Sequence, residues 1–301
     1  MLTPPALRNR LVAMGLMLGG FATVPTRHRG FSRLAEMLGK LATPGAMATV
    51  NLTPHSRFCF PLADAYWNRL LCPAYRYEPE IAHILRRLAG GPPCAFLDCG
   101  ANLGYWSVLA SDPAYGMASV TAVEMVPTTL QRLRANAALN GNRFQILPMA
   151  LHAADGAHAT LQNQHAHHSA ASITLAEGGS IATISLKTLV EQTCPTPAHI
   201  PVIKLDVEGV EDTVISGYPE LFNRPCVVVF EDHGRERNTP LANRLLADPR
   251  VRVLYVAPNG HTTRMQSVTQ MDALKTNPHM GYNFIATTNA LESRLSASTR
   301  R

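Results

Sequence analysis

A glycine-rich turn between an apolar segment and an expected helix constrains the fold of this chain most strongly. The apolar run 94–97 ends in Asp98, and Gly100 and Gly104 bracket a short turn before the apolar run 105–110. Glycine is favoured where the backbone must turn sharply or let a ligand approach closely. A helix N-terminus beyond such a turn presents unpaired N–H groups and a partial positive charge. The pattern predicts a strand, a ligand-binding turn and a helix.

An acidic residue follows the next apolar segment. The segment 119–123 is followed by Glu124, which lies twenty residues after Gly104. In Rossmann-type sheets, an acid at about this distance from the glycine turn accepts hydrogen bonds from ribose hydroxyls. We therefore expect Glu124 to bind the ribose of a nucleoside-containing ligand.

The spacing of the glycines distinguishes between such ligands. The turn reads Gly-x-x-x-Gly, and Ala101 and Asn102 stand where a dinucleotide fingerprint has its middle glycine. A pyrophosphate needs close backbone approach at that point, and the acid Asp98 suits a phosphate poorly. S-adenosylmethionine has no phosphate and carries an amino-acid end, a ribose and an adenine. The turn therefore favours S-adenosylmethionine, with Asp98, Gly100, Asn102 and Gly104 at its methionine part.

Strand and helix patterns alternate over most of the chain after this turn. We expect strands at 94–98, 119–124, 144–149, 201–206 and 226–231, and helices at 104–111, 128–139 and 211–216. This alternation predicts an α/β fold, with a doubly wound, Rossmann-like and mostly parallel sheet. Two later strands, at 251–256 and 283–287, show no clear helix between them and predict a terminal antiparallel pair.

Acidic residues and one histidine follow two of the expected strands. Asp206 and Glu208 follow the fourth strand, and His233 follows the fifth. Ligands of open α/β sheets bind outside the carboxyl ends of the strands. His233 is the candidate general base, since the ordinary pKa of histidine lies near neutrality. Asp206 and Glu208 are the other catalytic candidates.

The same strand ends could bind a divalent metal ion. Asp206, Glu231 and Asp232 would offer the carboxylate oxygens that hard cations prefer. The alternative is that these acids anchor Lys204 and loop N–H groups, because a lysine on a buried strand needs a carboxylate partner. Both interpretations stay open at this stage.

Several motifs in this order resemble the FkbM-type methyltransferases. The matching segments are 77–80 (YEPE), 97–105, 123–124, 150–151 with 155–156, 204–211 (KLDVEGVE) and 229–233. The resemblance covers residues 77–233 closely. It implies a class I methyltransferase sheet, S-adenosylmethionine as cofactor, and an adenine contact near Leu151 through the backbone. It also implies methylation of a hydroxyl on a sugar, glycan or polyketide-like metabolite. The alternatives are a nicotinamide-dependent oxidoreductase and a non-catalytic, methyltransferase-like binding protein.

The positive charge of the chain is confined to its N-terminal part. Residues 1–90 hold 11 Lys and Arg against 4 Asp and Glu, whereas residues 91–301 hold 16 against 17. We expect 1–90 to be an extension of two helices, 7–22 and 31–41, and a β-hairpin, and 91–301 to be the catalytic domain. The near-neutral catalytic part argues against a nucleic-acid channel. The uncharged run 11–24 is too short to span a bilayer.

Three further expectations concern partners and location. Residues 1–45 should mediate either self-association into a homo-oligomer or peripheral membrane contact. Six cysteines without a Cys-x-x-Cys pair indicate a reduced, cytoplasmic protein. The histidine-rich segment 157–185 is expected to be a lid or binding loop, because a loop of this length inside a compact domain usually has such a role.

Overall fold

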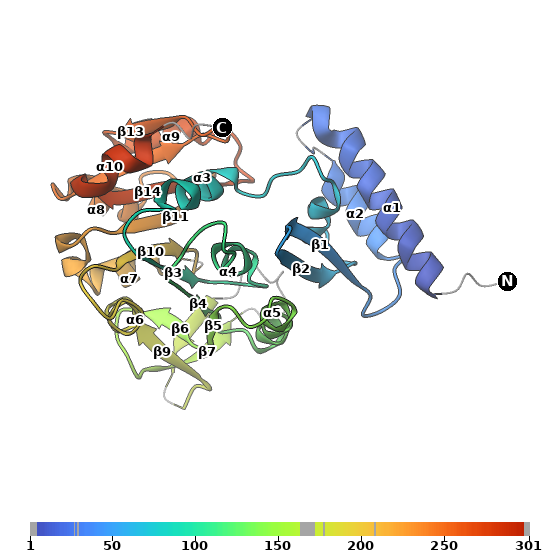
Figure 1. The fold of residues 1–301 in the computed structure, drawn as a ribbon, viewed down its shortest axis with the longest axis horizontal. Coiled ribbons are helices and arrows are strands. Elements are labelled where there is room, and N and C mark those ends of the chain that lie inside the picture. Colours follow the sequence, from blue (N-terminus) through green and yellow to red (C-terminus); the bar gives the residue numbers. More distant parts are fainter. Residues whose placement is uncertain are drawn as a thin grey trace. The chain divides into compact units, whose positions relative to one another are not determined.

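The chain forms two compact units, which span residues 1–77 and 78–301 and are coloured in sequence order in Figure 1. The computed structural model describes residues 5–26, 28, 30–162, 172–176, 178–207 and 209–297.

The first unit contains helices and one β-hairpin, as the sequence predicts. Its elements are α1 (Pro5–Thr23), η1 (Val24–Thr26), α2 (Phe31–Gly39), β1 (Met47–Thr53), β2 (Ser56–Pro61) and η2 (Trp67–Leu71). Val12 and Leu16 of α1 are buried together with Phe31 and Ala35 of α2. The strands pair in antiparallel fashion. Within the described residues, the search for a helix both long and apolar enough to cross a bilayer finds no candidate.

The second unit is built on an eight-stranded sheet with the order β13-β12-β14-β11-β10-β3-β4-β5. Its strands are β3 (Cys94–Cys99), β4 (Ser119–Val123), β5 (Gln145–Leu147), β10 (Ile200–Leu205), β11 (Val227–His233), β12 (Val251–Val256), β13 (Thr262–Met265) and β14 (Gly281–Thr288). Neighbouring strands from β5 through β4, β3 and β10 to β11 are parallel, and β14 pairs with β11 and β12 in antiparallel fashion. The expected mostly parallel, doubly wound sheet is confirmed.

Helices connect these strands. They are α3 (Pro79–Leu88), α4 (Tyr105–Ala110), α5 (Pro127–Leu139), α6 (Leu186–Thr193), α7 (Glu211–Ser216), η3 (Pro219–Asn223), α8 (Pro240–Ala247), α9 (Val268–Leu274) and α10 (Asn289–Ser296). The expectation of no helix between the last two strands was wrong, because α9 lies there. This short helix has Ser267 as its N-cap, and the side chain of Ser267 accepts a hydrogen bond from Gln270 N. Helix α3 packs on α10 within the second unit, although we assigned its residues to the extension; the domain boundary stays a prediction.

The histidine-rich segment is more regular than a loop. It contributes β7 (His158–Gln162), β8 (Ser172–Leu175) and β9 (Ile181–Ser185), which form a second sheet with β6 (Ala150–His152). Asp155 stabilises this sheet by accepting from the backbone N–H and the hydroxyl of Ser185. The remaining histidines of the segment, at 165, 167 and 168, lie outside the described residues.

The two faces of the main sheet differ in chemistry at the point where the site is expected. Leu97 and Leu205 belong to the apolar core that packs against α6, α7 and α8. Asp98 and Lys204 are register partners on adjacent strands. Since successive side chains of a strand point to opposite faces, both project away from that core. The polar side chains of the site therefore lie on the opposite face.

Candidate active site

The glycine turn follows β3 and contacts the ends of β4 and β10. Gly100 N and Ala101 N both donate to Val123 O at 3.0 Å, which ties the turn to β4. Gly100 has φ 79°, and a Cβ there would lie 1.8 Å from Asp206 O. Glycine is thus required by the close approach of the backbone after β10. A Cβ on Gly104, which has φ 84°, would lie 2.4 Å from Leu133 Cδ1.

Glu124 holds this turn in place. Its Oε2 accepts from Asn102 N at 2.9 Å, and its Oε1 accepts from Met125 N and Val126 N, both at 2.8 Å. Burial raises the pKa of Glu124, and these backbone N–H groups oppose that rise. A carboxylate offers about four lone-pair positions, so a ribose hydroxyl can still bind. Asn102 is itself in the left-handed region at φ 51°, and its side chain accepts from Leu103 N.

Asp98 is buried beneath the turn. Its Oδ2 accepts from Ser107 Oγ at 2.6 Å, and the residue is 1 % exposed. Burial raises the pKa of this carboxyl, while the nearby Lys204 lowers it. Asp98 therefore positions α4 through Ser107.

Lys204 is the cation of the polar face. Its Nζ donates to Asp206 Oδ2 at 2.7 Å, and the lysine is 5 % exposed. The expected pairing of Lys204 with a strand-end acid is confirmed. Burial alone would lower the pKa of Lys204, but Asp206, Glu78 and Asp98 together raise it. Three carboxyl groups thus surround one ammonium.

Glu78 also belongs to this group, although its position in the sequence indicated no role for it. Its Oε2 accepts from Trp106 Nε1 at 2.6 Å. Burial raises the pKa of Glu78 to about 7, against the opposing charge of Lys204. The YEPE motif marked the position, but the contact with Trp106 spans 28 residues. No local pattern could therefore have revealed it.

The acids that end β11 point to opposite faces of the sheet. Lys204 is the register partner of Val229, so Glu231 projects to the face of Lys204 and Asp232 to the other. Glu231 occupies the space at Gly281, where a Cβ would lie 1.3 Å from its Oε1. Asp232 is 2 % exposed and pairs with Lys275 Nζ at 2.6 Å.

This alternation separates the acids that we expected to share a metal ion. Asp206 pairs with Lys204 and Asp232 with Lys275. In the described part of the chain, no group of three or more His, Cys, Asp or Glu side chains could hold a metal ion. The structure therefore does not support the expected site at Asp206, Glu231 and Asp232.

Two other expected site residues, His233 and Leu151, have different surroundings. His233 is exposed at the end of β11, where its Nδ1 accepts from Arg235 N at 3.4 Å. Leu151 is 4 % exposed within the apolar core, so only its backbone could face an adenine. Glu208 lies outside the described residues. Nearby, Glu211 accepts from Val207 N and Gly209 N and shapes the turn after β10.

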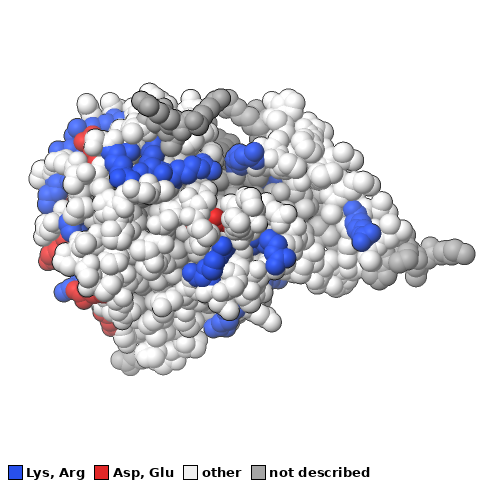
Figure 2. All heavy atoms as spheres, viewed as in Figure 1, with Lys and Arg blue, Asp and Glu red and all other residues white. Residues whose placement is uncertain are grey.

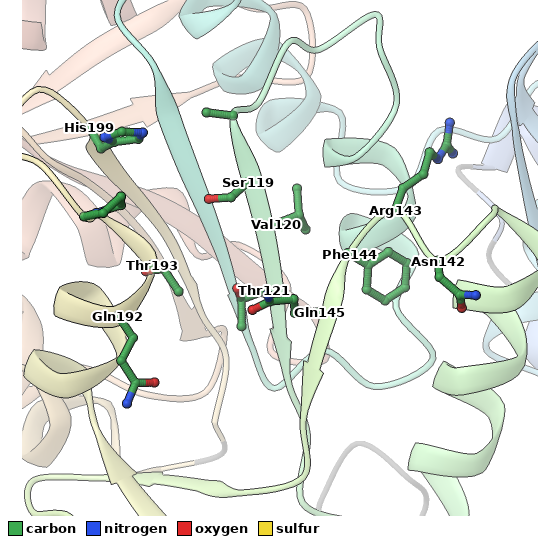
Figure 3. Close-up of a pocket in the computed structure, with 12 residues that line it drawn as sticks. Ser119, Val120, Thr121, Asn142, Arg143, Phe144, Gln145, Gln192, Thr193 and His199 are labelled. Carbon is green, nitrogen blue, oxygen red and sulfur yellow. The ribbon is translucent and has the colours of Figure 1, made fainter.

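A separate cavity lies at the other end of the sheet. It has a volume of about 500 Å³ and is lined by Ser119 and Thr121 of β4, by Arg143 and Phe144 before β5, and by His199 before β10 (Figure 3). These residues stand at or near the amino ends of parallel strands. Ligands of such sheets bind at the carboxyl ends, and none of the expected site residues lines this cavity.

The strand order, the glycine turn and the acid after β4 define a class I methyltransferase domain. The methyltransferase FkbM domain model matches residues 98–250, which is half of the chain. The protein therefore belongs to the FkbM methyltransferase family.

The solved structures to which this chain is similar include other methyltransferases, at low sequence identity. A methyltransferase FkbM from Methylobacillus flagellatus KT is 14% identical with a TM-score of 0.39; the match covers 74% of this chain and 52% of that chain. The chain thus spans about half the length of that protein. An O-methyltransferase from Bacillus cereus, solved with S-adenosylhomocysteine, is 14% identical with a TM-score of 0.39, and the match covers 72% and 84% of the two chains. The search of curated proteins finds no match.

Proposed function

We propose that the protein transfers the methyl group of S-adenosylmethionine to a hydroxyl oxygen of a sugar, glycan or polyketide-like metabolite. The observation that carries this proposal is the bridge made by Glu124. Its carboxylate holds Asn102 N of the glycine turn and stands at the end of β4, where it can accept from ribose hydroxyls. One acid thus couples the turn under the methionine part to the ribose position.

The charge of the polar face supports a cationic cofactor. Glu78, Asp98 and Asp206 surround a single ammonium, that of Lys204. An excess of carboxylate suits the sulfonium and α-amino groups of S-adenosylmethionine and disfavours the pyrophosphate of a nicotinamide cofactor. Burial raises the pKa of Glu78 and Asp98, because it disfavours their ionised forms. A cation that enters the site would favour the ionised carboxylates and would be stabilised by them.

Cofactor choice is tested by calorimetry on the full chain. We expect S-adenosylhomocysteine to bind and NAD to show no heat under the same conditions. Binding of NAD alone would favour an oxidoreductase. If S-adenosylhomocysteine binds but no methyl group reaches a panel of glycosides and polyketide alcohols, the hydroxyl acceptor class is wrong or the protein only binds the cofactor.

The chemistry required of the protein is mainly alignment and proton removal. The sulfonium is a good leaving group, so transfer needs the acceptor oxygen in line with the methyl carbon. An alcohol oxygen is a poor nucleophile until its proton is removed. The catalytic candidates from the sequence, His233, Asp206 and Glu208, stay predictions for this step.

A partner is proposed for the N-terminal unit. The large apolar residues that α1 exposes follow one another at intervals of four and three: Leu7, Leu11, Met14, Leu18 and Phe21, each 46 to 59 % exposed. This spacing places them in one stripe along the helix. The exposed Arg8 and Arg10 lie on α1 as well, and residues 1–45 contain six Lys and Arg against one Glu.

We infer that this stripe lies on an anionic lipid surface. Apolar side chains beside basic ones are the pattern of an interfacial helix, and each Lys or Arg near such a surface contributes about 1 kcal/mol. The same charge would repel a second copy of the chain. Lys and Arg side chains on one face of the molecule are drawn in blue in Figure 2. With six free cysteines, we propose a location at the cytoplasmic side of a membrane.

Vesicle flotation tests this partner. The full chain should bind vesicles that contain phosphatidylserine and should not bind pure phosphatidylcholine. The double variant Leu11→Gln, Leu18→Gln should lose binding, whereas Met280→Gln, at an exposed methionine of the second unit, should keep it. A stable dimer in light scattering without vesicle binding would assign the stripe to self-association.

A further inference from the structure

The carboxylate of Glu78 is held differently from the other acids of the polar face. Trp106 Nε1 donates to Oε2 at 2.6 Å, and among the described residues no hydrogen bond reaches Oε1. The residue as a whole is partly exposed. One oxygen is therefore fixed by an indole while the other stays available to a ligand.

The backbone of Glu78 is strained. The residue precedes α3 with φ 40° and ψ 60°, in the left-handed region. For a residue other than glycine this conformation costs on the order of 1 kcal/mol, and such residues concentrate at functional sites. The following Pro79 starts α3 with a fixed φ. The chain thus tolerates strain at the point that sets the carboxylate against Trp106.

Trp106 connects Glu78 to the cofactor turn. It is the second residue of α4, which starts directly after Gly104, and it is 2 % exposed. Lys204 and Asp206 influence the charge on Glu78 from the end of β10, and Asp206 O lies against Gly100. Glu78 therefore stands beside the turn that would hold the reactive end of the cofactor.

We propose that Glu78 is the general base that accepts the proton of the acceptor hydroxyl. This inference rests on the proposed methyl transfer. The hydroxyl proton passes to Glu78 Oε1 as the acceptor oxygen forms a bond with the methyl carbon. The carbon–sulfur bond breaks with its electron pair on sulfur, which leaves neutral S-adenosylhomocysteine. The carboxylic acid then returns the proton to water.

The electrostatics of the site suit this role. Burial raises the pKa of Glu78 to about 7, with Asp206 and Glu80 acting in the same direction and Lys204 and Trp106 in the opposite one. A base whose pKa lies near the working pH combines a usable ionised fraction with a favourable proton transfer. Glu80 is engaged elsewhere, because its Oε1 accepts from Asn283 Nδ2 at 2.8 Å.

The chain offers a direct probe of this carboxylate. It has two tryptophans, Trp67 and Trp106, so an ¹⁵N-indole spectrum contains two signals, which Trp106→Phe assigns. The Trp106 signal should titrate with a midpoint near pH 7. The isosteric Glu78→Gln should abolish this titration, and Glu220→Gln, the same change at an exposed position, should preserve it. A Trp106 signal that is flat from pH 5 to 9 would overturn the proposal.

Turnover supplies the second readout. With tritiated S-adenosylmethionine at saturating concentration and the glycoside and polyketide alcohol panel, Glu78→Gln should lower kcat by about 10²–10⁴-fold. A pH–rate profile that flattens in His233→Ala while Glu78→Gln turns over normally would make His233 the base. If the unaltered protein does not bind S-adenosylhomocysteine, the proposed methyl transfer itself is refuted.

Discussion

Two buried lysines at the carboxyl end of the same sheet have different surroundings. Lys275 follows α9, and its Nζ lies within hydrogen-bond distance of Asp232 at 2.6 Å, Asp272 at 2.8 Å and Glu236 O at 3.2 Å. An ammonium has three donors, so Lys275 is saturated. Among the described residues, the Lys204 ammonium donates to Asp206 alone, although other carboxyl groups lie near it.

The difference indicates which cluster is structural. The Lys275 cluster joins β11 to α9 on the apolar face and leaves no donor for a ligand. The Lys204 cluster has more carboxyl groups than one ammonium can neutralise. Burial raises the pKa of Glu78 and Asp98, and the charge of Asp206 acts in the same direction. Perturbed groups of this kind, next to a glycine turn, are typical of functional sites.

The largest expected effect lies in the saturated cluster. Lys275→Ala would leave the buried Asp232 without its cation, and breaking a buried pair costs about 3–5 kcal/mol. Urea unfolding should show this loss, and Lys275→Met combined with Asp232→Asn should recover most of it. Bound S-adenosylhomocysteine per folded molecule should not change. A loss below about 1 kcal/mol would mean that the pair is not structural.

The second effect concerns the acid that holds the glycine turn. Glu124→Ala should weaken S-adenosylhomocysteine by about 1.5–3 kcal/mol, the range for hydrogen bonds to a charged group. It also leaves the N–H groups of Asn102, Met125 and Val126 without their acceptor, so thermal stability should fall. Calorimetry on the folded variant gives the affinity. Unchanged affinity would restrict Glu124 to a structural role.

The parallel sheet and the cofactor turn could be predicted because local patterns encode them. The apolar runs, the turn glycines and Glu124 are separated by fixed, short distances in the sequence. The pairing of Lys204 also followed from the sequence, since a lysine on an apolar strand requires a nearby acid. Even the opposite faces of Glu231 and Asp232 follow from strand alternation, which the expected metal site overlooked.

Other parts of the site depend on contacts between distant segments. Lys275 meets Asp232 only because β14 folds back beside β11, and neither residue's neighbours in the sequence indicate that pairing. Glu78 acquires its properties from Trp106 and Lys204, which belong to two other elements. The sequence marked Glu78 within a motif, but burial and charge at that position arise only on folding.

The smallest expected effect is the pH dependence that Glu78 gives to stability. Its pKa rises from 4.5 to about 7 on folding, so between these values the folded protein binds more protons than the unfolded chain. Stability from this group is therefore present below about pH 4.5 and is lost as the pH rises towards 7.

Glu78→Gln imitates the protonated form and removes this loss. Relative to the unaltered protein, the variant should be about 1–2 kcal/mol more stable at pH 8 and equally stable near pH 4.5. The full shift would give more at 1.36 kcal/mol per pKa unit, but Glu78 is partly exposed, and solvent screening reduces the contribution of its charge. Urea unfolding at both pH values measures the difference, and Glu220→Gln provides the control. A difference that does not change with pH would mean that Glu78 ionises as freely in the folded protein as in the unfolded chain, and the contrast between the two lysine clusters would then rest on hydrogen bonding alone.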